Sequence, residues 1–178
     1  MNRIISLLAL LCAFAACEAQ MLPNSRPLPT YMADSTGKPL LMDFSIDLTG
    51  INDLSTPFSV FSQRPLMIYY FSPHCPHCVR NYGNVQKMAK EYEQRGLASI
   101  AVSIGNVTKR DILMFIEQQK GSIPFLQDAS QEFSKRYGDG YVPRLYVVSP
   151  DGKIVRYTDS GSENLPNIKA DIEKLLSK

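Results

Sequence analysis

Two cysteines and two histidines stand within one short segment, His74-Cys75-Pro76-His77-Cys78. Two thiols separated by two residues can alternate between a dithiol and a disulfide, and outside the reducing cytosol such a pair is typical of thiol–disulfide exchange. Cys75 is predicted to be the nucleophile. Cys78, expected to be the more buried, is predicted to resolve the mixed disulfide, so that the oxidised form carries a Cys75–Cys78 disulfide.

The neighbouring elements are predicted to place Cys75 at the start of a helix. Residues 66–71 (LMIYYF) form an uninterrupted apolar run, which is typical of a strand buried on both faces. A helical pattern follows over residues 75–94, with Cys75 as N-cap and Pro76 at the first helical position. Free backbone N–H groups and the helix dipole would then stabilise the Cys75 thiolate, and Pro76 and His77 would tune the redox potential.

The same side chains could instead hold a metal ion. His74, Cys75, His77 and Cys78 carry sulfur and nitrogen atoms, which are good ligands for copper and zinc. Adjacent residues point in different directions, however, and tetrahedral zinc sites usually draw their ligands from two separated pairs. No metal is therefore expected as a resident group, and a copper-binding metallochaperone is the alternative function.

The rest of the chain alternates predicted strands and helices, which indicates an α/β fold with a central mixed sheet sandwiched by helices. Further strands are predicted over residues 40–46, 99–104, 124–127, 144–149 and 153–158. Further helices are predicted over residues 109–119, 130–137 and 163–176, the second with Ser130 as N-cap. Pro150-Asp151-Gly152 predicts a hairpin between the last two strands.

The N-terminus is predicted to be a targeting signal. Residues 4–16 are apolar, a run shorter than the ~20 residues of a membrane-spanning helix but suited to a secretory signal. Phe14-Ala15-Ala16-Cys17 resembles a bacterial lipobox, which implies removal of residues 1–16 and lipidation of Cys17. Cleavage after Ala19, which would release a soluble protein, is the alternative.

Composition and length indicate one folded unit behind an extended segment. Residues 17–39 are rich in proline and are predicted to form a tether, and residues 40–178 are predicted to form one domain. The net charge is +2, with no block of one sign, so a nucleic-acid partner is not expected. No phosphate-binding loop or nucleotide fingerprint is present in the sequence, and no bound cofactor is expected.

Two motifs resemble the thioredoxin superfamily: FSPHCPHC at residues 71–78 and GYVP at residues 140–143. More narrowly, residues 40–177 are similar to the TlpA/ResA-like membrane-tethered thiol–disulfide oxidoreductases, since a helix and a strand are inserted between the motifs over residues 109–127. The resemblance implies a thioredoxin-like fold. It also implies an enzyme of the bacterial periplasm that exchanges disulfides with other proteins through the two cysteines of the first motif.

The resemblance further implies a cis peptide bond between Val142 and Pro143, lying against Cys75. The side chains expected to contact partner proteins are Val142, Tyr141, Arg144 and His74. The expected partners are protein thiols and disulfides, together with a membrane redox protein that resets the active site. The chain is expected to act as a monomer that is associated with the membrane through its lipid anchor.

Two departures from the family's pattern concern proton transfer. Tyr69 stands where thioredoxins often bury a carboxylic acid that accepts the proton of the second cysteine. Asn106 stands where ResA-like reductants carry a functional glutamate. No proton acceptor for Cys78 is therefore predicted, and because the Pro-His pair between the cysteines resembles DsbA-like oxidants, the direction of electron transfer stays open.

Overall fold

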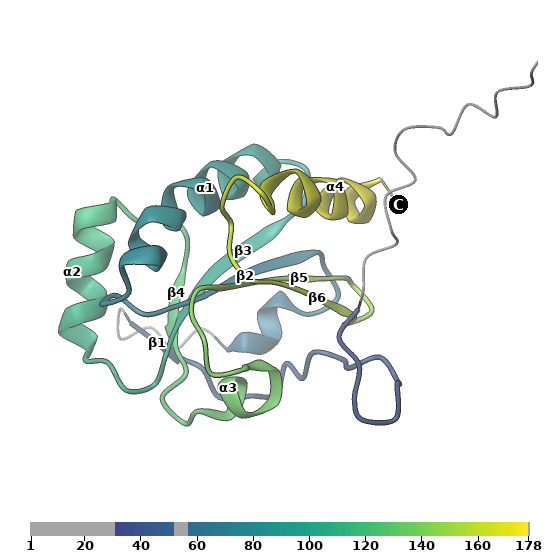
Figure 1. Ribbon diagram of the computed structural model, residues 1–178, viewed down its shortest axis with the longest axis horizontal. Coiled ribbons are helices and arrows are strands. Elements are labelled where there is room, and N and C mark those ends of the chain that lie inside the picture. Colours follow the sequence, from purple (N-terminus) through teal and green to yellow (C-terminus); the bar gives the residue numbers. More distant parts are fainter. Residues whose placement is uncertain (1–30, 52–56, 178) are drawn as a thin grey trace, which may run out of the picture.

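A mixed sheet with the strand order β1-β4-β3-β2-β5-β6 runs through the centre of the protein (Figure 1). The structure is a computed structural model that describes residues 31–51 and 57–177. Its strands are β1 (Thr49–Gly50), β2 (Leu66–Phe71), β3 (Ala98–Ser103), β4 (Phe125–Gln127), β5 (Arg144–Val148) and β6 (Ile154–Tyr157). Its helices are the 3-10 helix η1 (Phe58–Phe61), α1 (Pro76–Glu93), α2 (Lys109–Gln119), α3 (Glu132–Tyr137) and α4 (Leu165–Leu176).

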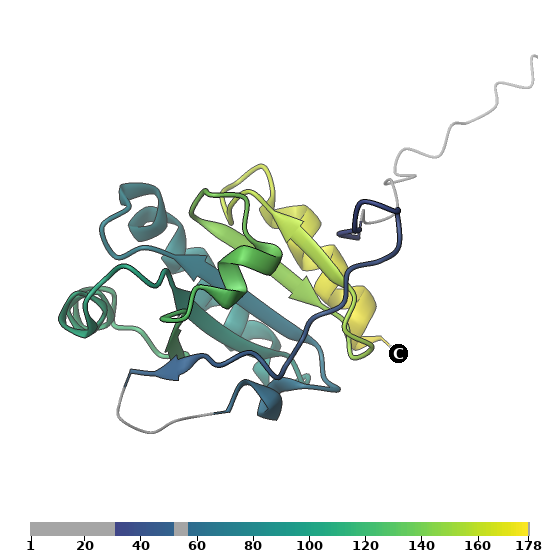
Figure 2. The same cartoon turned by 90° about the horizontal axis from the view of Figure 1, so that it is seen from below.

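Helices cover both faces of this sheet. β2, β3 and β4 are parallel, whereas β5 runs antiparallel to β2 and pairs with β6 in a hairpin. α1 and α4 lie over one face, with α2 beside α1 (Figure 1), and Figure 2 shows α3 across the other face. The predicted α/β, thioredoxin-like arrangement is confirmed, including the inserted helix and strand, which are α2 and β4.

β2 lies inside the sheet, between β3 and β5, and each of its residues is buried. Side chains alternate between the faces of a strand, so one run of apolar residues serves two cores. Met67, Tyr69 and Phe71 belong to the core beneath α1 and α4, and Ile68 and Tyr70 belong to the core beneath α3. The strand is thereby fixed on both sides, and its carboxyl end holds the segment that carries the two cysteines.

The strand predicted over residues 40–46 is wrong. In this region Leu41 makes only an isolated β-bridge. Asp43 starts a turn, because its carboxylate accepts hydrogen bonds from the backbone N–H (2.9 Å) and the hydroxyl of Ser45. The backbone N–H of Asp43 also donates to the Tyr137 hydroxyl at 2.7 Å, which holds the turn against α3. A polar side chain that bonds its own backbone competes with strand pairing, and here it prevails.

The N-cap predicted at Ser130 is also wrong. α3 follows Gln131, which has a left-handed backbone conformation with φ of 60°. The Ser130 hydroxyl accepts from the N–H of Glu132 at 3.3 Å, and the buried carboxylate of Asp128 accepts from the first-turn N–H groups of Phe133 at 3.0 Å and Ser134 at 2.9 Å. The start of α3 is therefore stabilised by a residue outside the helix that also anchors the end of β4.

Residues 31–39, which belong to the predicted tether, lie along the outer edge of β6. Tyr31 faces Val155 in a β-bridge, and the backbone N–H of Met32 donates to the carbonyl of Ile154 at 2.7 Å. The predicted signal segment and Cys17 lie outside the described residues. Within residues 31–51 and 57–177, no helix combines the length and the apolar character needed to cross a bilayer.

Candidate active site

Cys75 occupies the N-cap of α1, and Pro76 is the first helical residue, as predicted. The N–H of Cys75 donates to the carbonyl of Ser72 at 3.2 Å, and its own carbonyl accepts from Val79 at 3.1 Å. The side chain of Cys75 makes no capping hydrogen bond and is only partly buried. Its sulfur is therefore accessible at the positive end of a helix, where the dipole favours a negative charge.

The second motif lies directly against this sulfur. The Cys75 thiol donates to the carbonyl oxygen of Val142, with a sulfur–oxygen distance of 3.7 Å. The Val142–Pro143 peptide bond is cis, which confirms the expectation from the resemblance. Two segments far apart in the sequence thus meet at Cys75, and a partner chain that reaches the sulfur also meets the backbone of Val142.

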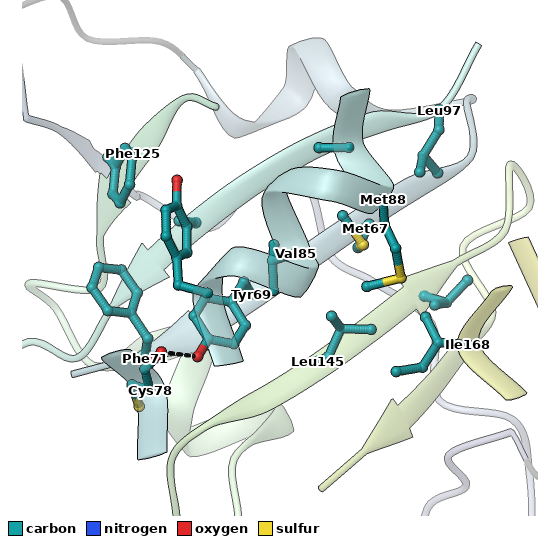
Figure 3. Packing of buried hydrophobic residues seen from close by; sticks show 14 of the residues in the cluster. Met67, Tyr69, Phe71, Cys78, Val85, Met88, Leu97, Phe125, Leu145 and Ile168 are labelled. Atoms are coloured by element: carbon teal, nitrogen blue, oxygen red, sulfur yellow. Dashed lines mark hydrogen bonds between the residues drawn. The ribbon is translucent and has the colours of Figure 1, made fainter. Parts of the chain in front are cut away.

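Cys78 lies one turn into α1, is 0% exposed, and packs in the core beneath the helix (Figure 3). Burial raises the pKa of the Cys78 thiol to about 12, although a hydrogen bond from the backbone of Ser72 acts in the opposite direction. Both cysteines are free thiols in this structure. The pair is therefore asymmetric, since one sulfur is reachable from solvent and the other is kept protonated below it.

Tyr69 lies beneath the pair, where thioredoxins often bury an acid. Its hydroxyl donates to the carbonyl of Cys78 at 2.8 Å (Figure 3). Burial, with a further contribution from the Cys78 thiol, raises the pKa of Tyr69 well above its usual range. Tyr69 is thus a neutral hydrogen-bond donor that holds the first turn of α1, and it is unsuited to accept the proton of Cys78.

His77 contacts Arg80 in this structure, with 2.9 Å between the guanidinium Nη2 and the ring Nδ1. A guanidinium can only donate, so Nδ1 is the accepting nitrogen of this contact. Asn81 also donates to the backbone carbonyl of His77 at 2.9 Å. Tuning of the redox potential by Pro76 and His77 stays a prediction.

Tyr141 and Arg144 stand on either side of the cis bond but differ in their availability to a partner. Tyr141 is 69% exposed. The Arg144 side chain is only 12% exposed, because its Nε donates to Asp139 at 3.0 Å and its Nη1 donates to the carbonyls of Pro143 and Thr158. Its guanidinium also lies 5.5 Å from the ring centre of Tyr141. Arg144 therefore braces the loop, and Tyr141 is the side chain that a partner can reach.

His74 points toward α2 and meets a residue that the sequence reasoning missed. Its Nε2 lies 3.4 Å from the carboxylate of Asp111. Asp111 takes part in a capping box with Thr108, whose hydroxyl accepts from the Asp111 N–H at 3.2 Å. The Thr-x-x-Asp spacing predicts the start of a helix. Nothing in the sequence shows that this helix begins beside Cys75.

A metal centre has little support in the part of the chain that the structure describes. No group of three or more His, Cys, Asp or Glu side chains there has an arrangement that could hold a metal ion. The two histidines of the motif diverge, since His74 faces Asp111 and His77 faces Arg80. The copper-binding alternative therefore gains no ligand set from this geometry.

Comparison with known proteins places this arrangement in a family. The family described as Redoxin matches residues 36–175, a span that contains both motifs. The chain belongs to the Redoxin family. This membership agrees with the resemblance to thioredoxin-like proteins found in the sequence.

Curated relatives of this Redoxin protein are distant. It is 27% identical over 115 residues to the mercury resistance operon ORF3 of Streptomyces lividans, covering 62% of this chain and 61% of that protein. It is 24% identical over 98 residues to the thiol-disulfide oxidoreductase ResA of Halalkalibacterium halodurans, covering 55% of each. The matched region thus spans little more than half the length of these relatives.

Solved structures share the fold of this Redoxin protein. A secreted Mycobacterium tuberculosis disulfide oxidoreductase homologous to E. coli DsbE superposes with a TM-score of 0.65 at 13% identity, covering 74% of this chain and 97% of that one. A thiol-disulfide isomerase from Corynebacterium glutamicum superposes with a TM-score of 0.65 at 16% identity, covering 79% and 97%. At such low identity these likenesses show the fold alone.

Proposed function

We propose that this Redoxin protein is a thiol–disulfide oxidoreductase that exchanges disulfides with other proteins through Cys75 and Cys78. The observation that carries the proposal is the asymmetry of the pair. Cys75 is reachable at the start of α1 and contacts Val142, whereas Cys78 is buried one turn below with its pKa raised by burial. An accessible attacking sulfur beside a protected resolving sulfur is what a two-step exchange requires.

In the reductive direction, the dithiol of this protein reduces a disulfide of the partner in two steps. The Cys75 thiolate attacks one sulfur of a partner disulfide, forms a mixed disulfide, and releases the other partner sulfur as a thiolate. Cys78 then loses its proton and attacks the sulfur of Cys75. The mixed disulfide breaks, the Cys75–Cys78 disulfide forms, and the second partner thiolate leaves and takes up a proton. Two electrons pass to the partner, and the oxidative direction is the same sequence reversed.

The surroundings of Cys75 support a protein as the other reactant. The carbonyl of Val142 accepts from the Cys75 thiol, Tyr141 precedes Val142 and is exposed, and the exposed His74 directly precedes Cys75. An extended partner segment can pair with backbone groups of this kind in the manner of an added strand.

We further propose that the protein works outside the cytoplasm of a bacterium, in the periplasm, and that a lipid on Cys17 holds it to a membrane. The sequence of residues 1–16 and the lipobox-like motif support this location. A membrane redox protein would reset the active site, and the reacting unit would be a monomer.

Trapping of the mixed disulfide tests the function. In a Cys78→Ser chain the resolving sulfur is absent, so Cys75 should accumulate as a stable mixed disulfide with a disulfide-bonded protein such as intact insulin. The matched Cys75→Ser chain should trap nothing and should exchange no faster than an unrelated free thiol. Trapping by Cys75→Ser at the rate of Cys78→Ser would overturn the proposed roles.

Equilibration of the unaltered protein with glutathione then assigns the direction. A potential near about −270 mV, as in thioredoxin, indicates a reductant, and a potential near about −120 mV, as in DsbA, indicates an oxidant.

A further inference from the structure

A groove opens beside the active-site loop, between that loop and α2. The groove has a volume of about 190 Å³ and is lined by Pro73, His74, Asp111, Met114, Phe115 and Gln118. We call it the α2 groove. The four residues from α2 are spaced at i, i+3, i+4 and i+7, so they form one face of that helix. Pro73 and His74 directly precede Cys75, so the groove lies beside the residues that lead into the reactive cysteine.

One wall of the α2 groove is apolar and fixed in position. Phe115 is buried and packs against Phe71 of β2, with ring centres 4.7 Å apart. Met114 is 45% exposed and adds a flexible apolar surface on the solvent side. Such a wall suits the methylene groups of a long side chain, which can lie along apolar surface while the polar end stays near water.

The polar end of the α2 groove is negative. Two hydrogen bonds from Thr108 hold the pKa of Asp111 below its usual range, so its side chain is a carboxylate at neutral pH. Gln118, about two helical turns away, adds a neutral amide, and none of the described residues that line the groove is a lysine or an arginine. The imidazole of His74 faces the carboxylate at 3.4 Å from the exposed rim, where its side chain is 64% exposed. A cationic group that enters from solvent therefore meets a carboxylate whose other partner, His74, lies on the exposed rim.

We propose that the α2 groove binds a lysine or arginine side chain of the partner protein, carried by a residue close to the partner's reactive cysteine. The methylene stem would lie on Met114 and Phe115, and the cationic head would reach Asp111. The inference rests on the proposed function, because it adds a preference for basic sequence around the target cysteine to the same exchange reaction.

The distance along the chain limits which partner residue can reach the groove. His74 precedes Cys75 directly, so the two Cα atoms are about 3.8 Å apart. An extended partner segment advances about 3.4 Å per residue. The basic residue should therefore stand one or two positions from the partner's cysteine.

Three test peptides with identical sequence except for one residue next to a single cysteine provide the experiment. That residue is lysine, leucine or glutamate, and the cysteine is held as a mixed disulfide with 5-thio-2-nitrobenzoate. The Cys75 thiolate attacks the peptide sulfur, a new disulfide forms, and the coloured 5-thio-2-nitrobenzoate leaves. Each rate is divided by the rate at which the same peptide reacts with 2-mercaptoethanol. This ratio removes the effect of the peptide's charge on the intrinsic reactivity of its disulfide.

The matched variants are Asp111→Asn and Glu117→Gln. Asparagine keeps an oxygen that can accept from Thr108 and removes only the charge. Glu117 is exposed on the same helix but does not line the groove, so its substitution removes the same charge elsewhere. The lysine peptide should react about two- to fivefold faster than the glutamate peptide, the range that an exposed ion pair supports. Asp111→Asn should abolish that difference, and Glu117→Gln should preserve it.

Other outcomes overturn the inference. Fastest reaction of the leucine peptide, with no effect of Asp111→Asn, would show a purely apolar subsite. Fastest reaction of the glutamate peptide would show that His74 selects an anion. Equal rates for the three peptides would show that the groove does not contact the partner. The proposed function has its own test, which also uses 2-hydroxyethyl disulfide as a substrate. If this protein reacts with the three peptides and with 2-hydroxyethyl disulfide no faster than an unrelated thiol does, the proposed function itself is overturned.

Discussion

Cys75 and Cys78 should differ by a large factor in their rates of alkylation. The pKa of the Cys78 thiol is about 12 in the folded protein, against an ordinary value of 9.0, because the side chain is buried. Three pKa units correspond to about 4 kcal/mol and to roughly a thousandfold smaller fraction of thiolate near pH 8. Since the thiolate is the reactive form, Cys78 in the folded chain should react with iodoacetamide at least about a hundredfold more slowly than an unfolded thiol.

Two single-thiol variants make this measurement direct. Cys78→Ser leaves Cys75 in place, and Cys75→Ser leaves Cys78. Mass spectrometry of the peptide that contains the remaining thiol follows labelling at pH 8, with the chain folded and in guanidinium chloride. Cys75 should label readily in the folded chain, and Cys78 should label readily only after unfolding. Labelling of Cys78 in the folded chain at its unfolded rate would refute the protection argued here.

Two further predictions concern stability. Asp128→Ala leaves the N–H groups of Phe133 and Ser134 and the Tyr70 hydroxyl without their buried acceptor, so urea unfolding should show a loss of about 3 kcal/mol. A loss below about 1 kcal/mol would contradict the capping role. The raised pKa of Cys78 stabilises the folded state fully below pH 9.0, and this contribution is lost as pH rises toward about 12. Cys78→Ala should remove that alkaline loss, and an unchanged pH dependence would contradict it.

The elements around the cysteines could be predicted from sequence because their signals are local. The run LMIYYF is apolar on both faces of a strand, and it is buried throughout as predicted. Pro76 fixes the start of α1 because proline lacks a backbone N–H and the first helical position does not need one. In both cases the physical reason lies within a few residues, so tertiary contacts do not change the structure that the local sequence favours.

The errors arise where contacts that lack a recognised local sequence pattern determine the structure. Residues 40–46 are rich in apolar side chains, yet the turn at Asp43 is held by the hydroxyl of Tyr137. Ser130 is a good N-cap type, but the carboxylate that caps α3 comes from the buried Asp128. The contact of His74 with Asp111 follows from how α2 packs beside α1. None of these contacts has a local sequence pattern that could reveal it.

The position of Tyr31 shows which end of the protein faces away from the active site. Tyr31 faces Val155 in β6, and Val155 pairs with Val147 in β5. β5 begins at Arg144, three residues or about 10 Å before Val147 at 3.4 Å per residue, and Val142, which accepts from the Cys75 thiol, precedes that end of the strand. Tyr31 therefore lies toward the end of the sheet opposite the reactive sulfur. If the chain is attached to a membrane through the residues before Tyr31, Cys75 faces away from that membrane, toward molecules that approach from the aqueous side.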